Sequence, residues 1–215
     1  MRVIIFTWEF PPRIVGQLSH YVNKLAIELV KKSVDTYVIT YHDSWIGYHQ
    51  GADGVKAYRV SNPVKSQINI LTWTLNLNQE VERVAADIYY LAKREVDLID
   101  VCDWHFIPAA VSLKRGLGIP FVFSIDSLED HRSHGSSAPL SLSIKGLELL
   151  GVDEAERVLV KSEWMKEEVR RIYKTPLEKI DIVLPHSPAW IDEILITYRK
   201  ALGISPNLAF KLGLE

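Results

Sequence analysis

The chain has 215 residues, a net charge of −2 and 47% hydrophobic residues, which fit one good-sized domain with its own buried core. The slightly acidic balance argues against a nucleic-acid-binding surface, and a single cysteine, Cys102, excludes an internal disulfide. The apolar run at the amino terminus is too short for a signal peptide or a membrane span. Composition therefore predicts a cytoplasmic protein without a membrane or nucleic-acid partner.

Short apolar runs predict a series of strands along the chain. Several of them are uninterrupted, which is typical of strands that are covered on both faces. The predicted strands lie at residues 3–6, 36–40, 55–60, 98–101, 120–124, 157–160 and 179–184. Between the second and third strands, residues 41–54 are polar and contain His42 and His49, so we expect an exposed loop there.

Helical patterns alternate with these strands. Ser19 is the expected N-cap of the first helix, and Ser162 that of a later helix whose acidic start and basic end suit the helix dipole. Residues 66–94 read as two helical pieces, the second from residue 79. The other predicted helices span residues 19–32, 107–115, 163–173 and 189–202, with a short one after the last.

This alternation predicts an α/β fold, in which a doubly wound and mostly parallel sheet carries helices on both faces. Ligands of such sheets bind beyond the carboxyl ends of the strands. The polar segments 9–18, 102–106 and 125–139 each follow a predicted strand. We therefore expect these three loops to converge on one rim of the sheet.

The first of these segments places a glycine before a helix. Gly16 would let the backbone approach an anion closely, and the N-terminus of the following helix favours negative charge. Arg13 would supply a forked donor to a phosphate or a carboxylate. Because one glycine is a weak signal, a proline-stiffened turn with a surface arginine is the alternative.

The second segment has Asp103, Trp104 and His105 directly after a buried strand. Carboxylates accept hydrogen bonds from sugar hydroxyls, and aromatic rings offer a flat apolar surface to the face of a sugar. The alternative is structural, with Asp103 capping the next helix and Trp104 in the core.

The third segment combines carboxylates, among them Asp126 and Glu129, with two histidines. His131 and His134 are three residues apart, which suits one face of a helix, but no third metal ligand has a firm spacing. We therefore expect neither a metal nor a cofactor. A substrate loop and a solvated, mobile loop both remain open.

Taken together, these segments resemble the glycogen and starch synthases, which are retaining glycosyltransferases of the GT-B fold. The resemblance covers residues 1–187, which correspond to the amino-terminal, Rossmann-like half of such an enzyme. Residues 188–215 are expected to form a helical tail in place of the second domain. The similar stretches, in the family's order, are TWEFPPRIVGQLSHYV, VCDWHFIPAAVSLKR, PFVFSIDSLED, RVLVKSEWMKEEV and KIDIVLPHS.

The resemblance implies transfer of glucose from ADP-glucose or UDP-glucose to an α-1,4-glucan, with retention of configuration. The amino-terminal domain of the family holds the acceptor and touches the donor across a cleft. By position, Arg13 and Gly16 would lie near the donor phosphates, while Asp103 and His105 would line the cleft. The implied substrate-binding set is Glu9, Arg13, Gly16, Gln17, Asp103, Trp104, His105, Asp126 and Glu129, and no catalytic residue is assigned.

Two departures from the family pattern affect the donor site. Gln17 replaces a second glycine, and its side chain would crowd a closely approaching phosphate. Asp126 replaces a sugar-contacting histidine, and an ionised carboxylate only accepts hydrogen bonds and repels phosphate. After the first helix, Ser33 stands where a glycine is expected at the C′ position.

The nucleotide pocket of the family and its leaving-group cations belong to the carboxy-terminal domain, so we expect this chain alone to be weakly active or inactive. Three functions stay open: a glycogen synthase-type enzyme half, a non-catalytic module that binds a glucan or a partner, and one half of a split enzyme. The apolar face of the helix at 189–202 would cover the face that the second domain of the family occupies, or pair with a second copy in a homodimer.

Overall fold

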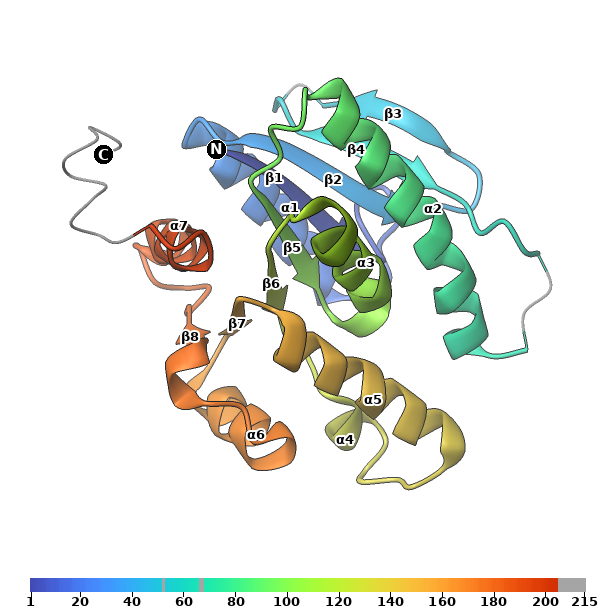
Figure 1. The fold of residues 1–215 in the computed structure, drawn as a ribbon, viewed down its shortest axis with the longest axis vertical. Helices are drawn as coiled ribbons and strands as arrows, with labels where there is room; N and C mark the ends of the chain where they lie inside the picture. Colours follow the sequence, from blue (N-terminus) through green and yellow to red (C-terminus); the bar gives the residue numbers. More distant parts are fainter. Residues whose placement is uncertain (52, 66–67, 205–215) are drawn as a thin grey trace.

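The computed structural model describes residues 1–51, 53–65 and 68–204. In this part of the chain an eight-stranded sheet lies at the centre, in the order β3-β4-β2-β1-β5-β6-β7-β8 (Figure 1). The strands are β1 (Arg2–Thr7), β2 (Asp35–Tyr41), β3 (Gly47–Gln50), β4 (Lys56–Val60), β5 (Leu98–Cys102), β6 (Phe121–Ser124), β7 (Arg157–Val160) and β8 (Ile180–Ile182).

Neighbouring strands are parallel except for the β3–β4 pair, which is antiparallel. β1 is central, and its Ile4 lies opposite Tyr37 of β2 on one side and Ile99 of β5 on the other. Val3 to Phe6 are completely buried, which explains why this strand is apolar without interruption. The expected mostly parallel α/β sheet is confirmed.

Helices cover both faces of the sheet, and each face has its own hydrophobic core. The first core contains side chains of α2, α3, α5 and α6, and the second contains those of α1 and α7. Figure 1 shows α2 and α3 in front of the sheet and α1 behind it. The helices are α1 (Gln17–Lys31), α2 (Ile70–Leu91), α3 (Ile107–Leu117), α4 (Glu129–Arg132), α5 (Pro139–Glu154), α6 (Glu163–Tyr173) and α7 (Trp190–Ala201), with short 3₁₀ turns η1 (Trp104–Phe106) and η2 (Leu177–Lys179).

The two predicted N-caps have different outcomes. The side chain of Ser162 accepts a hydrogen bond from the backbone N–H of Met165 at 3.1 Å, as predicted. Ser19 is not a cap, because α1 begins two residues earlier and Ser19 is buried inside its first turn. Gly16 occupies the cap position, and no side chain bonds to the helix start from there.

The prediction of two helical pieces over residues 66–94 is wrong, because α2 is continuous from Ile70 to Leu91. A polar residue in its middle, Asn78, breaks the apolar pattern of the sequence. Its amide donates to the carbonyls of Thr74 and His105, both at 2.8 Å, and accepts the N–H of Ala109 at 2.9 Å. These long-range partners let a polar side chain stay buried inside a helix.

Three of the observed elements, β3, α4 and α5, were absent from the prediction. The polar segment at 41–54, expected to be an exposed loop, contains β3, which pairs with the edge of β4 through backbone hydrogen bonds. Helix α5 includes Gly146, Gly151 and several serines, which are weak helix formers. Packing stabilises it instead, since Gly151 lies directly against Ile107 and the ring of Phe123.

Helix α7 packs on the same sheet as α1. Ile194 and Tyr198 are fully buried, and the Tyr198 hydroxyl donates a hydrogen bond to the buried carboxylate of Asp100 in β5. Its apolar face therefore contributes to the core of this domain. The short helix expected after it lies in residues 205–215, outside the described residues.

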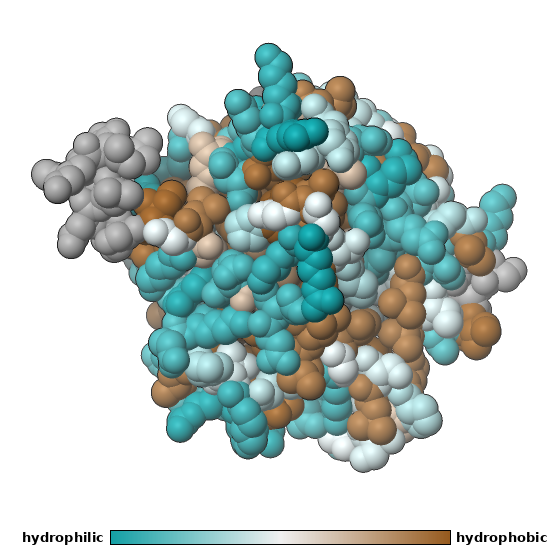
Figure 2. Space-filling model, viewed as in Figure 1, coloured by the Kyte–Doolittle hydropathy of each residue, from teal (hydrophilic) through white to brown (hydrophobic). Residues whose placement is uncertain are grey.

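Polar and apolar side chains are interspersed on the face of the molecule seen in Figure 2. The exposed apolar residues of α2 and α5 include Leu75, Leu142 and Leu149. Within the described ranges, no helix is long and apolar enough to cross a membrane.

Candidate functional site

Three loops meet at the carboxyl edge of the sheet, as the sequence predicts. β1, β5 and β6 are adjacent and parallel, so the loops that follow them leave the same edge. The first and second loops touch where the rings of Trp8 and His105 stack at 5.0 Å. The second and third loops touch where the Arg132 guanidinium lies 3.8 Å from the Asp103 carboxylate. The candidate residues therefore do form one rim.

Glu9 fills the anion position at the start of α1. Its carboxylate is buried and its Oε2 accepts the backbone N–H groups of Val15 at 2.6 Å and Gly16 at 2.7 Å. A Cβ on Gly16 would lie 3.4 Å from the other oxygen of Glu9. These two N–H groups lie just before α1, so an internal carboxylate already takes backbone donors that a phosphate near this helix start could use. Gln17 begins α1 and is exposed.

Arg13 is held by protein groups on several sides. Its guanidinium carbon lies 4.8 Å from the ring centre of Trp8 and 4.9 Å from that of Tyr41. Its Nη1 donates to the Trp8 carbonyl at 3.2 Å, and its Nε lies 3.5 Å from the Asp43 carboxylate. Arg13 thus braces the first loop against the end of β2 through cation–π and ionic contacts.

Asp103 combines a structural role with an unusual backbone. Its Oδ1 accepts the N–H of Trp104 at 2.9 Å, so it does cap the short turn η1 that leads into α3. Its φ of 67° and ψ of 175° fall in a region that favours glycine. Burial raises the pKa of Asp103 to about 7, although nearby Arg132 acts in the opposite direction. This carboxyl group can therefore hold or release a proton near neutral pH.

Trp104 and His105 are both buried, and His105 lies between two indole rings. Its ring is nearly parallel to Trp8 at 5.0 Å and to Trp104 at 4.3 Å. Burial, helped by the positive charges of Arg132 and Arg13, lowers the pKa of His105 to about 3. Its Nδ1 has no hydrogen-bond partner among the described residues. A neutral imidazole whose Nδ1 has no partner can form one hydrogen bond with a hydroxyl group, as donor or acceptor according to its tautomer.

Asp126 and Glu129 both pair with cations in this structure. Asp126 forms an ion pair with Lys161, whose ammonium also lies 3.7 Å from the ring centre of Tyr21 in α1. Glu129 is buried and its carboxylate lies 3.2 Å from the Nε of Arg132. The charges at these two positions are therefore compensated locally.

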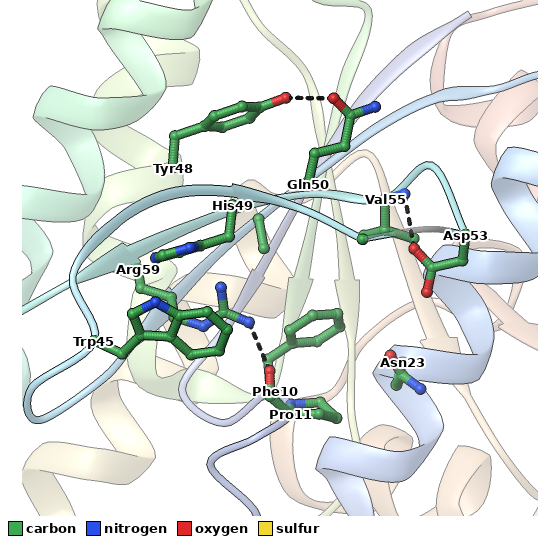
Figure 3. Close-up of a pocket in the computed structure, with 12 residues that line it drawn as sticks. Phe10, Pro11, Asn23, Trp45, Tyr48, His49, Gln50, Asp53, Val55 and Arg59 are labelled. Carbon is green, nitrogen blue, oxygen red and sulfur yellow. Dashed lines mark hydrogen bonds between the residues drawn. The ribbon is translucent and has the colours of Figure 1, made fainter.

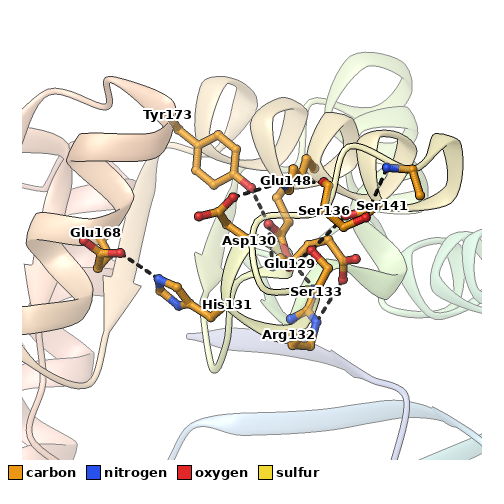
Figure 4. Close-up of polar contacts among 12 residues, drawn as sticks. Glu129, Asp130, His131, Arg132, Ser133, Ser136, Ser141, Glu148, Glu168 and Tyr173 are labelled. Atoms are coloured by element: carbon orange, nitrogen blue, oxygen red, sulfur yellow. Dashed lines mark hydrogen bonds and ion pairs between the residues drawn. The ribbon is translucent and has the colours of Figure 1, made fainter.

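Arg132 is a central residue of the rim that the sequence did not indicate. Its Nη2 lies 2.7 Å from Glu148, and its Nη1 donates to Ser127 at 2.6 Å (Figure 4). Glu148 is completely buried and also accepts the backbone N–H of Glu129 at 2.8 Å and the hydroxyl of Tyr173. Arg132 thereby fixes α4 against α5. No sequence signal pointed to it because α5, which carries Glu148, was not predicted.

The pair of histidines in α4 and its following turn is not arranged around a metal. His131 Nε2 lies 2.7 Å from the Glu168 carboxylate, and its ring lies 4.8 Å from that of Trp164. Over residues 1–51, 53–65 and 68–204, no group of three or more His, Cys, Asp or Glu side chains could hold a metal ion.

Beside the rim lies a hollow of about 430 Å³ with aromatic walls, here called the aromatic hollow. Tyr41 and Trp73 form one corner, with ring centres 4.7 Å apart and nearly perpendicular planes. Neither residue was predicted, although an aromatic residue at the end of a strand was a visible signal. The hollow is lined by Trp8, Arg13, Tyr41, Asp43, Asn69, Ile70 and Trp73.

The mostly parallel sheet with helices on both faces has the fold of one half of a GT-B glycosyltransferase. The chain matches Glycosyltransferase Family 4 over residues 18–185 and belongs to that family. This match includes the loops after β5 and β6.

Curated relatives agree with this family. The chain is 32% identical to an uncharacterized glycosyltransferase of Methanocaldococcus jannaschii, over 96% of this chain and 53% of the relative. It is 22% identical to a glycogen synthase of Mycobacterium tuberculosis, over 85% of this chain and 47% of that enzyme. The chain thus spans about half the length of the curated relatives it matches.

Solved structures share the fold at low sequence identity. Sucrose-phosphate synthase of Thermosynechococcus elongatus superposes with a TM-score of 0.69 at 16% identity, over 85% of this chain and 47% of that enzyme. The catalytic domain of starch synthase IV of Arabidopsis thaliana, bound to ADP and acarbose, gives 0.61 at 13% identity, over 85% and 51%. Anabaena HepE with UDP-glucose gives 0.55 at 13% identity, over 96% and 50%.

Proposed function

We propose that residues 1–187 are the acceptor-side domain of a glycogen synthase-type glycosyltransferase. In the proposed reaction, a hydroxyl of an α-glucan replaces the nucleoside diphosphate at the anomeric carbon of ADP-glucose or UDP-glucose. A glycosidic bond forms, the bond from carbon to the nucleotide phosphate breaks, and the hydroxyl proton is released. Residues 188–204 complete the core of the same domain through α7, and a cytoplasmic setting is proposed on composition alone.

The aromatic hollow carries this proposal. It presents the rings of Trp8, Tyr41 and Trp73 for stacking on sugar faces, and the Asp43 carboxylate for accepting sugar hydroxyls. The first loop, which also carries Glu9, supplies Trp8 and Arg13 to the hollow. Trp8 connects the hollow to His105, because the two rings stack. Such a surface suits a neutral sugar chain better than it suits a pyrophosphate.

The contacts of the first loop support an acceptor role over a donor role. The backbone donors at the start of α1 already hold Glu9, and the guanidinium of Arg13 already pairs with Asp43. Catalysis of glycosyl transfer needs cationic or hydrogen-bonding groups that stabilise the departing phosphate. We therefore propose that groups outside residues 1–187 complete the donor site, and that the chain alone turns over little.

Two other functions remain alternatives to this proposal. A non-catalytic module that binds a glucan or a partner would keep the aromatic hollow without any transfer. A split enzyme would recruit the nucleotide-binding half from a separate chain, whereas a homodimer would place two acceptor sides together.

The experiment that tests the acceptor role is a thermal-shift titration of the purified chain. Maltooligosaccharides are compared with ADP-glucose and UDP-glucose, because a ligand that binds only the folded state raises the melting temperature. We expect the maltooligosaccharides to stabilise the chain. A shift with the nucleotide sugars alone would contradict an acceptor role and assign the rim to the donor.

A matched pair of tryptophan variants locates the binding. Trp73→Ala removes a wall of the aromatic hollow, and we expect about tenfold weaker glucan binding because a stacked aromatic ring is lost. Trp164→Ala removes an exposed tryptophan from α6 and should bind the glucan as the wild type does. Equal losses in both variants would show that the glucan binds elsewhere.

A further inference from the structure

A second cavity lies away from the aromatic hollow and shares no lining residue with it. It has a volume of about 570 Å³ and lies among the β3–β4 hairpin, α1 and the loop after β1 (Figure 3). The hairpin contributes His49 and Arg59, the segment just before it contributes Trp45, and α1 contributes Asn23. Of the three rim loops, the one after β1 contributes Phe10 and Pro11, whereas the loops after β5 and β6 contribute no lining residue.

Arg59 is the unusual group of this cavity. It is only 5% exposed, and its Nη2 donates to the carbonyl of Pro11 at 2.7 Å. Its Nε and Nη1 have no hydrogen-bond partner within the described part of the chain. Burial lowers its pKa, and no carboxylate of the described residues acts against that shift. A buried cation without a counter-charge is costly, and folded proteins normally pair such groups.

Trp45 covers this guanidinium from the solvent side. Its ring centre lies 4.3 Å from the guanidinium carbon of Arg59 and 4.2 Å from the ring of His49. The Nε2 of His49 is also buried without a partner in the described residues. Trp45 itself is 45% exposed and lines the cavity, so its indole can contact a molecule bound there.

We propose that this cavity is a binding site for a small anionic sugar, whose phosphate or carboxylate pairs with Arg59 and whose ring packs on Trp45. An anion would supply acceptors for the two guanidinium nitrogens that lack a partner among the described residues, and the unpartnered His49 nitrogen would add a further hydrogen bond. The amides of Asn23 and Gln50, which also line the cavity, suit sugar hydroxyls. The proposal does not rest on glycosyl transfer, because the site is separate from the aromatic hollow.

Isothermal titration calorimetry of the purified chain tests this site directly. The probes are inorganic phosphate, glucose monophosphate and glucuronate, with glucose as the uncharged control. We expect binding of at least one of the charged sugars, with quenching or a shift of tryptophan fluorescence, and no binding of glucose. Binding of the phosphate-bearing probes alone would show that the site takes a sugar phosphate. Binding of glucuronate would show that it takes a sugar carboxylate.

A pair of arginine variants assigns the binding to the cavity. Arg59→Met keeps a long apolar side chain and removes the charge. We expect it to keep the fold and to bind the charged probe at least about tenfold more weakly than the wild type does. Arg115→Met removes an exposed arginine of α3 that pairs with Glu154, and it should bind as the wild type does. Trp45→Phe should bind the probe but lose the fluorescence change.

Two results would overturn the proposal. One is the absence of binding by the wild-type chain for every charged probe. The other is unchanged affinity in Arg59→Met, which would place any bound anion elsewhere. Should Arg59→Met fail to fold, an unaltered fluorescence response in Trp45→Phe would equally overturn it, because the signal would then come from another site.

Discussion

At the scale of single residues, burial acts on two neighbours in opposite directions. It raises the pKa of Asp103 and lowers the pKa of His105, so both groups favour their neutral forms inside the rim. The sequence indicated both residues because they directly follow a buried strand. It could not indicate their protonation, which depends on the rings of Trp8 and Trp104 and on Arg132, all brought there by folding.

Asp103→Asn tests this protonation. A folded-state pKa of about 7 lies above the usual value of 3.8, so the stability that protonated Asp103 contributes is lost as pH rises between them. Asparagine does not ionise and avoids this loss. We expect the stability of Asp103→Asn relative to wild type to rise by about 2–3 kcal/mol between about pH 5 and pH 8. Urea unfolding at both pH values measures it, and a pH-independent difference would contradict the shifted pKa.

Ser33 gives a second prediction at this scale. It follows α1 with a φ of 60°, and the next N–H, of Val34, bonds to the Leu29 carbonyl at 3.0 Å, as at many helix ends that carry glycine. Ser33→Gly should therefore stabilise the chain by about 0.5–1 kcal/mol, since the left-handed strain exceeds the entropy that glycine costs. Ser33→Ala keeps the strain and is the control. Equal melting temperatures of the two variants would argue against strain at this position.

At the scale of elements, the sequence correctly predicted the strands and helices whose own residues have a strong local preference for that structure. β7 and α6 appear at the predicted residues, because RVLV is a short apolar run and Ser162 caps the helix. β3 and α5 were missed because their residues carry weak local preferences. β3 depends on backbone pairing with β4, and α5 depends on its contact with α3 and β6.

Two glycines of α5 separate packing from helix propensity. A Cβ on Gly151 would lie 2.8 Å from Ile107 and from the ring of Phe123, so Gly151→Ala should destabilise the chain by about 1–3 kcal/mol. A Cβ on Gly146 would meet nothing within 4 Å, so Gly146→Ala should stabilise it by about 0.5–1 kcal/mol. Urea unfolding measures both. The same sign for the two variants would mean that α5 does not pack as described.

At the scale of the whole molecule, the sheet order brings the candidate residues together. Loops far apart in the chain meet because β1, β5 and β6 are neighbours, and α7 closes the opposite core through Tyr198 and Asp100. The chain spans about half of its curated relatives.

The ion pairs of the rim give a prediction for the isolated chain. Incubated with UDP-glucose or ADP-glucose and maltooligosaccharides, it should release nucleoside diphosphate at no more than the rate of a heat-treated sample, because Arg13 and Lys161 are already paired with carboxylates. A coupled nucleotide assay measures the release. Release that grows with chain concentration and disappears in Asp103→Asn would contradict the prediction and show that this half suffices.

The sequence by itself determined the class of fold and the position of the rim. Apolar runs alternate with helical patterns, and polar segments follow three of the runs. These patterns are visible in the sequence because strand burial and helix periodicity depend on residues that are close together in the chain. The resemblance to glycosyltransferases rested on those same segments, and the family match confirmed it.

Only the tertiary structure decided what these residues contact. It placed Glu9 on the backbone N–H groups of Val15 and Gly16, packed Arg13 against two aromatic rings, and left Arg59 buried with two nitrogens that lack a hydrogen-bond partner among the described residues. Each of these depends on partners that are distant in sequence or on backbone groups that carry no sequence signal. Hydrogen bonds and buried charges are satisfied by whatever folding brings within about 3 Å, and a linear pattern does not encode that proximity.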